Sequence, residues 1–74
     1  MNKTKSDDSQ KTPPLSEREM LTLRGLCLLR GESLHRWILR RRRDPFNAYA
    51  ELRGVRNHSK ALRFRSEVRK EFSI

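Results

Sequence analysis

Residues 15–31 read LSEREMLTLRGLCLLRG and contain the start signal, body and stop signal of one α-helix. Ser16 and Glu19 have the spacing of a capping box, in which each side chain bonds to the backbone N–H of the other residue. Gly31 readily adopts the left-handed conformation in which many helices end. This stretch therefore predicts a helix over residues 17–30.

The predicted first helix is apolar on more than one side. Met20, Leu23 and Cys27 lie on one face, whereas three more leucines lie on other flanks: Leu21, Leu28 and Leu29. A helix at the edge of a small domain normally has a single apolar stripe. We therefore expect these three leucines to contact a protein partner or a second copy of the chain.

Asp44 and Pro45 mark the boundary between two further helices. A residue before proline avoids the helical conformation, while Asp and Pro are favoured as the N-cap and first residue of a helix. Gly54 ends the second of them, and either Asn57 or Ser59 is expected to cap the last. The predicted helices cover residues 33–43, 45–53 and 58–72, which makes the domain an all-α bundle of three to four short helices.

Apolar spacing predicts which residues of these helices face the core. They are Leu34, Trp37 and Ile38 in the second helix, Phe46, Tyr49, Ala50 and Leu52 in the third, and Ala61, Phe64, Val68 and Phe72 in the last.

Residues 1–14, MNKTKSDDSQKTPP, contain no large apolar residue after Met1. A segment that cannot bury apolar surface does not fold alone, so we expect a disordered tail here. Residues 15–74 are expected to form one basic helical domain, because a chain of 74 residues has room for a single domain.

The chain has 18 Lys and Arg residues against 9 Asp and Glu, a formal net charge of +9. Charge of this size favours polyanions as partners. The densest positive stretch is Arg36, Arg40, Arg41, Arg42 and Arg43, in which the first, second and last recur at helical spacing. We predict that this run grips phosphate groups. An acidic protein surface, a nuclear localisation patch and an ordinary solvated face are the alternatives.

Residues 49–64, YAELRGVRNHSKALRF, resemble the helix-turn-helix of bacterial repressors and activators. Ala50, Gly54 and Val55 match the small residue, the turn glycine and the apolar residue that follows it. Polar residues stand where the pattern expects an apolar one five or six positions after the glycine. The resemblance implies that the last helix contacts base edges. Its N-terminal residues would do so: Asn57, His58, Ser59, Lys60 and Arg63. Arg56, in the preceding turn, is a further candidate contact to nucleic acid.

Catalysis and metal binding are not expected. Cys27, His35 and His58 are the only cysteine and histidines. They are too few for a structural zinc site, which needs about four ligands, and too scattered for a nucleophile–base pair. We therefore expect no enzyme activity, no metal and no cofactor.

Two function hypotheses remain. The first is a small cytoplasmic regulator that binds nucleic acid, with DNA favoured over RNA and a homodimer as one form. The second is an adaptor or inhibitor that docks on an acidic protein through the leucines of the first helix. A membrane partner is not expected, because no run reaches the roughly 18 apolar residues of a membrane span.

Overall fold

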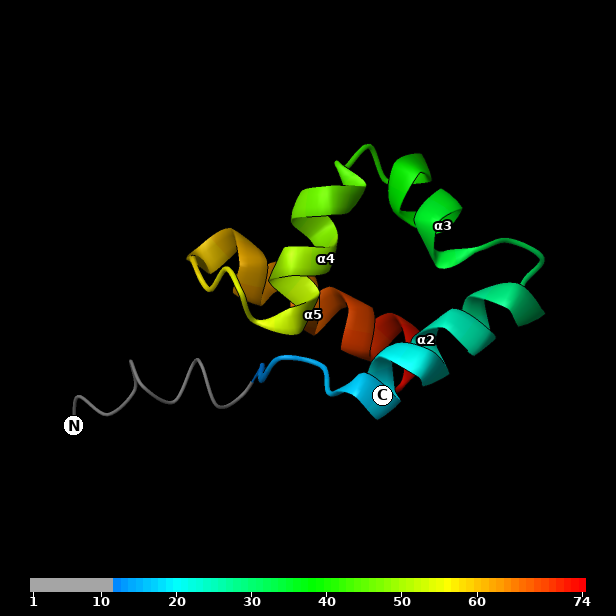
Figure 1. Ribbon diagram of the computed structural model, residues 1–74, viewed down its shortest axis with the longest axis horizontal. Coiled ribbons are helices and arrows are strands. Elements are labelled where there is room, and N and C mark those ends of the chain that lie inside the picture. The colour runs from blue at the N-terminus through cyan, green and yellow to red at the C-terminus, as the bar shows by residue number, and fades with distance from the viewer. Residues whose placement is uncertain (1–11) are drawn as a thin grey trace.

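The computed structural model describes residues 12–74, and within them the chain is all-helical (Figure 1). In chain order the helices are α2 (Glu17–Leu29), α3 (Leu34–Arg40), α4 (Pro45–Arg53) and α5 (Ser59–Phe72). The prediction of an all-α bundle is confirmed. Of the predicted disordered tail, residues 1–11 lie outside the described residues.

Consecutive helices pack on one another: α2 on α3, α3 on α4, and α4 on α5. In Figure 1 α4 lies across α5, and the end of α5 returns to the beginning of α2. Two ion pairs join α2 to α5. Arg69 pairs with Glu19 at 3.1 Å, and Arg30, the C-cap of α2, pairs with Glu71 at 2.9 Å. The first and last helices of the described chain are thereby held together.

The N-terminus of α2 forms as the sequence predicts. The Glu19 N–H donates to Ser16 Oγ at 3.1 Å, and the Ser16 N–H donates to Glu19 Oε1 at 2.9 Å, which completes the capping box. Leu15 and Met20, which flank this cap, are both buried. A hydrophobic contact around the cap fixes the angle at which the chain enters the helix.

The caps of the other helices confirm one expectation and correct another. Asp44 caps α4, as predicted, by accepting the Asn47 N–H at 3.0 Å. The cap of α5 is His58, whose Nδ1 accepts the Ala61 N–H at 3.1 Å. The prediction of Asn57 or Ser59 at this position is therefore wrong.

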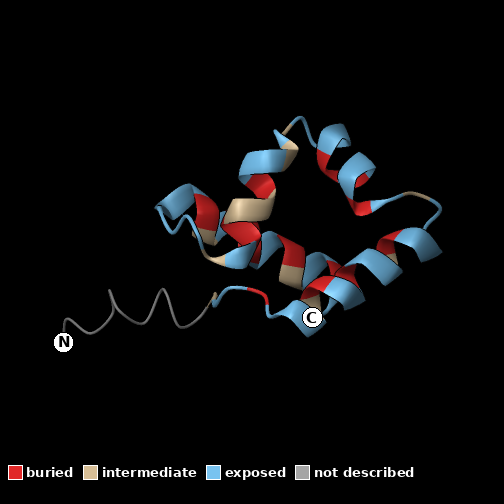
Figure 2. Cartoon of the chain, viewed as in Figure 1, coloured by how far each residue is buried: buried red, intermediate tan, exposed pale blue. Residues whose placement is uncertain are grey.

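The core draws residues from every described helix and from the segment before α2 (Figure 2). Trp37 packs against Phe64 and Phe72, with ring centroids 6.5 and 5.2 Å apart. The inward faces predicted for α3 and α5 are confirmed. The buried apolar side chains are Leu15, Met20, Leu23, Cys27, Leu34, Trp37, Ile38, Ala48, Leu52, Ala61, Phe64, Val68 and Phe72.

The inward face predicted for α4 is partly wrong. Phe46 is 74% exposed, whereas Ala48 and the carboxylate-bearing Glu51 are buried beside Leu52. Glu51 faces inward because Arg43, from the segment before α4, binds its carboxylate there. Helical geometry then turns Phe46 outward, since it lies about 200° around the helix from Ala48.

Helix α3 ends at Arg40, three residues before the predicted end at residue 43. Arg42 adopts a left-handed conformation with φ of +59°, which stops the helix. The N–H groups of Arg42 and Arg43 donate to the carbonyls of Leu39 and Ile38 at 2.9 and 3.3 Å. This is the Schellman arrangement, which satisfies carbonyls that the end of the helix would leave unpaired.

Candidate nucleic-acid interface

The predicted arginine run does not form one continuous face. Arg36 and Arg40 lie on α3 and are exposed, but α3 ends before Arg43 can continue their row. The Arg43 side chain points inward and is only 24% exposed. The prediction that these three share one helix face is therefore wrong.

Arg40 is bound by an acid close to it in sequence. Its Nε and Nη2 donate to the two carboxylate oxygens of Glu32 at 2.9 and 2.8 Å, a bidentate contact. These hydrogen bonds, with the positive charge of Arg40, hold the pKa of Glu32 below its usual range. The Arg40 side chain is 67% exposed, but its guanidinium already has a partner.

Arg41 and Arg43 are bound by acids that belong to other helices, α5 and α4. Arg41 lies 3.9 Å from a Glu67 carboxylate oxygen on α5, and its guanidinium lies 4.7 Å from the centre of the Trp37 ring. Arg43 pairs with Glu51 on α4 and lies 4.1 Å from the centre of the Phe64 ring. The fold therefore neutralises arginines for which the sequence shows few neighbouring acids.

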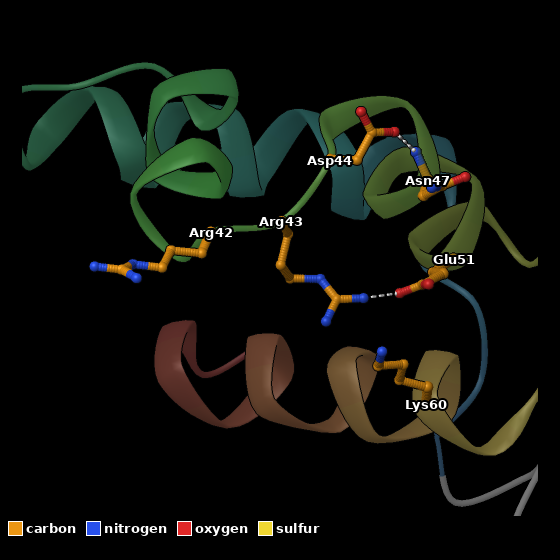
Figure 3. A pocket seen from close by; sticks show the side chains of 6 residues that line it. All are labelled: Arg42, Arg43, Asp44, Asn47, Glu51 and Lys60. Carbon is orange, nitrogen blue, oxygen red and sulfur yellow. Dashed lines mark hydrogen bonds and ion pairs between the residues drawn. The ribbon is translucent and has the colours of Figure 1, made fainter.

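Arg42 remains free at the corner between α3 and α4. Within residues 12–74 its side chain has no hydrogen bond or ion pair, and the residue is exposed. Figure 3 shows Arg42 extending away from Glu51, whereas Arg43 extends toward it. Both arginines line a hollow together with Asp44, Asn47, Glu51 and Lys60. Lys60 belongs to α5, so the arginine run and the predicted recognition helix meet at this place.

The turn between α4 and α5 fits the helix-turn-helix pattern only in part. Gly54 has φ of +86°, the conformation that the pattern requires of its glycine. Val55, which the pattern would bury, is 75% exposed. Asn57 has little capacity left for a base, because its Nδ2 donates to the Gly54 carbonyl at 2.8 Å and its Oδ1 accepts from Arg65 at 3.0 Å.

The other predicted contacts to nucleic acid are differently placed. His58 is held as the cap of α5, and its Nε2 lies 3.8 Å from Glu51. The side chains of Arg56, Lys60 and Arg63 are exposed and have no ion pair within the described chain. Arg56 lies in the turn, and the other two lie three residues apart on α5, so they share a helix face.

Arg65 is a structural residue that the sequence prediction missed. It is fully buried, and its Nη1 donates to the Glu51 carbonyl at 2.8 Å as well as to Asn57. Burial lowers the pKa of its guanidinium, and the charge of Arg69 lowers it further. The signal was its position, since Arg65 stands four residues after Ala61 and so falls within the apolar stripe of α5.

Arg65 and Arg69 also fasten the segment that precedes α2. Arg65 Nε donates to the Thr12 carbonyl at 3.0 Å, and Arg69 Nη2 donates to the Pro13 and Pro14 carbonyls at 3.0 and 3.2 Å. These bonds fix the chain three residues before the predicted start of the domain at residue 15. The segment passes close to the α4–α5 turn, where Pro14 contacts Gly54.

The three leucines predicted as a contact surface are exposed on α2. The exposed fractions are 63% for Leu21, 65% for Leu28 and 84% for Leu29. Gly25 lies among them at helical spacing, and a β-carbon placed there would have no heavy atom within 4 Å. No neighbouring atom of the described chain therefore requires a glycine at this position.

Cys27 is buried in the core, and this burial raises the pKa of its thiol. Among residues 12–74, no group of three His, Cys, Asp or Glu side chains is arranged to hold a metal ion. No helix in this part of the chain combines the length and apolar character needed to cross a membrane.

Exposed cations without an ion pair outnumber the unpaired acids of the described chain. Within residues 12–74, nine exposed Lys and Arg residues have no ion pair, whereas only two acids, Glu17 and Asp44, lack one. The nine are Arg18, Arg24, Arg36, Arg42, Arg53, Arg56, Lys60, Arg63 and Lys70.

No protein-family model, curated protein or solved structure matches this chain.

Proposed function

We propose that this chain is a small cytoplasmic regulator that binds nucleic acid through its phosphate groups, with duplex DNA as the favoured partner. One observation carries the proposal: nine exposed cations are unpaired within the described chain, against two unpaired acids. Such cations displace the counterions condensed on nucleic acid, and the release of these ions favours binding. The large share of arginine suits this role, because its planar guanidinium binds phosphate in a bidentate manner.

The contact face is proposed to include the start of α5 and the corner between α3 and α4. Lys60 and Arg42 line one hollow, and Arg63 lies three residues beyond Lys60 on α5. A helix of 14 residues with exposed cations in its first two turns can lie in or beside the major groove. In this arrangement Lys60 and Arg63, which share a face of α5, contact phosphates of the duplex.

The proposal is tested by fluorescence anisotropy with the full chain, a short labelled DNA duplex of random sequence and a single-stranded RNA of equal length. We expect duplex binding at about 50 mM salt that weakens steeply toward about 200 mM. Absence of duplex binding at the lower salt concentration would overturn the proposal. Tighter binding of the RNA would overturn the preference for DNA.

A matched pair of variants locates the face. Lys60→Gln with Arg63→Gln should make the slope of log K against log salt less negative by about 2, because two phosphate contacts are lost. Arg18→Gln with Arg24→Gln removes the same charge from α2 and should change the slope by less than about 0.5. Equal losses for the two double variants would show that attraction is spread over the whole molecule and that α5 is not its centre.

A second candidate function is docking to another protein through α2. Leu21, Leu28 and Leu29 are exposed around Gly25, which gives an approaching helix room to come close. Leu28→Glu should abolish recovery of one stoichiometric protein in a pull-down after nuclease treatment. Light scattering of the wild-type chain separates this partner from a second copy, since a homodimer doubles the molar mass without any other protein.

A further inference from the structure

Arg42 occupies a backbone position that this chain otherwise gives to small residues. Left-handed residues also follow α2, α4 and α5: Gly31 with φ of +90°, Gly54 with +86° and Ser73 with +55°. Arg42, after α3, has φ of +59°. A residue with a β-carbon is strained there, whereas glycine makes the same helix end without this strain.

The Arg42 side chain provides no contact that offsets this strain within the described chain. It is exposed and has no hydrogen bond or ion pair in residues 12–74. Its neighbours differ, since Arg41 stacks on Trp37 and Arg43 binds Glu51. The Schellman hydrogen bonds at this corner use only backbone atoms of Arg42, so glycine would preserve them.

We propose that Arg42 is a phosphate-contact residue, held outward by its left-handed backbone at the edge of the hollow that it lines with Lys60. This inference rests on the proposed function and names the ligand group, a phosphodiester of the nucleic-acid backbone. The Arg43–Glu51 pair on the same hollow is neutral as a unit, and Asp44 uses its Oδ2 to cap α4. Arg42 and Lys60 are therefore the cations of this hollow that are free to bind an anion (Figure 3).

The test compares stability and affinity in one variant, Arg42→Gly. Because the strain is removed, the melting temperature should rise, by about 4 °C. Because one phosphate contact is lost, affinity for the labelled DNA duplex should fall about tenfold at about 50 mM salt and about threefold at about 200 mM. A purely structural role for Arg42 cannot produce opposite changes in these two measurements.

Three further variants serve as controls. Arg42→Asn removes the charge but keeps a residue that tolerates this conformation, so it should lose affinity as Arg42→Gly does. Arg42→Lys keeps the charge and the strain, so its melting temperature should match the wild type and its affinity should fall less than Arg42→Asn. Arg40→Gln changes the net charge by the same amount as Arg42→Asn, and we expect at most a twofold loss, roughly, because Glu32 already binds this guanidinium.

The outcomes separate the two levels of the proposal. If the wild-type chain does not bind the duplex at about 50 mM salt, the proposed function fails and this inference fails with it. If the wild type binds and Arg42→Gly binds equally well, or if Arg40→Gln loses as much affinity as Arg42→Gly, the inference alone is overturned. An unchanged or lower melting temperature for Arg42→Gly would also overturn it.

Discussion

At the corner between α3 and α4, Arg42 extends into solvent and the Arg41 side chain is 40% exposed, whereas on α5 Arg65 is fully buried and the Arg69 side chain is 17% exposed. The sequence alone draws attention to the corner, because its arginines are contiguous, whereas those of α5 are separated by other residues. The difference lies in what the fold brings near each guanidinium. Backbone carbonyls surround Arg65, and carboxylates reach three residues of the run.

The comparison teaches that an arginine can serve as a hub for the backbone. Arg65 joins the segment before α2, the last turn of α4 and the α4–α5 turn through carbonyls of Thr12, Glu51 and Arg56. A planar group with five N–H donors can bind several acceptors at once, which lysine cannot do in this geometry. A small domain with a limited apolar core gains order from such a hub.

The largest expected effect is that of Arg65→Met. This change removes the hydrogen bonds from the guanidinium to the Thr12, Glu51 and Arg56 carbonyls and should lower the free energy of unfolding by about 3 kcal/mol. Urea denaturation followed by the fluorescence of Trp37, the only tryptophan, measures it. Arg65→Lys should recover less than half of the loss. If Arg65→Met lowered the free energy of unfolding by less than about 1 kcal/mol, the hydrogen bonds of Arg65 to the backbone would not stabilise the fold as proposed.

Arg43→Met should have the next largest effect. Glu51 has a side chain only 5% exposed, so loss of Arg43 leaves a nearly buried carboxylate without its main partner. We expect a loss of about 2 kcal/mol in the same denaturation experiment. Arg40→Gln is the matched control, because the Arg40 side chain is 67% exposed and the loss of its pair with Glu32 should lower the free energy of unfolding far less. Similar losses in the two variants would remove the distinction between inward and outward members of the run.

Gly54→Ala and Gly31→Ala test the contact between the α4–α5 turn and the segment before α2. Both glycines have positive φ, so each alanine should cost about 1 kcal/mol. At Gly54 the added β-carbon would lie 2.6 Å from Pro14 Cγ, whereas at Gly31 it meets no atom within 4 Å. Gly54→Ala should therefore lose about 1 kcal/mol more than Gly31→Ala. Equal losses in the unfolding experiment would mean that the segment moves away at little cost.

The smallest expected effect concerns the pair between α2 and α5. The hydrogen bond from Arg69, with that from the Ser16 N–H, holds the pKa of Glu19 below its usual range. Stability from this group is present above the unfolded value of about 4.3 and is lost as the pH falls through the lower folded value. Because Glu19 is partly exposed, the contribution should stay below about 1 kcal/mol. Thermal unfolding from neutral pH to acid should therefore show a slightly smaller fall for Glu19→Gln than for the wild type, and an identical fall would contradict the pKa shift.

The local parts of this fold follow from short-range features of the sequence. The starts of α2 and α4 are set by capping hydrogen bonds and by the fixed backbone of proline, which act over at most four residues. The residues concerned are Ser16, Glu19, Asp44 and Pro45. The stripe from Ala61 to Phe72 predicted the buried face of α5, because α5 is long enough for its apolar spacing to fix which side faces inward. Such features need no knowledge of distant residues.

Long-range contacts set which charges are free and which side of a short helix is buried. Arg43 and Glu51 determine that Phe46 faces outward, and they meet only because α3 ends at Arg40, before it reaches Arg43. The burial of Arg65 depends on carbonyls contributed by residues as distant as Thr12. Electrostatic and hydrogen-bond partners act through space, so the arginine run could be located from the sequence, but the division of its members between structure and surface could not.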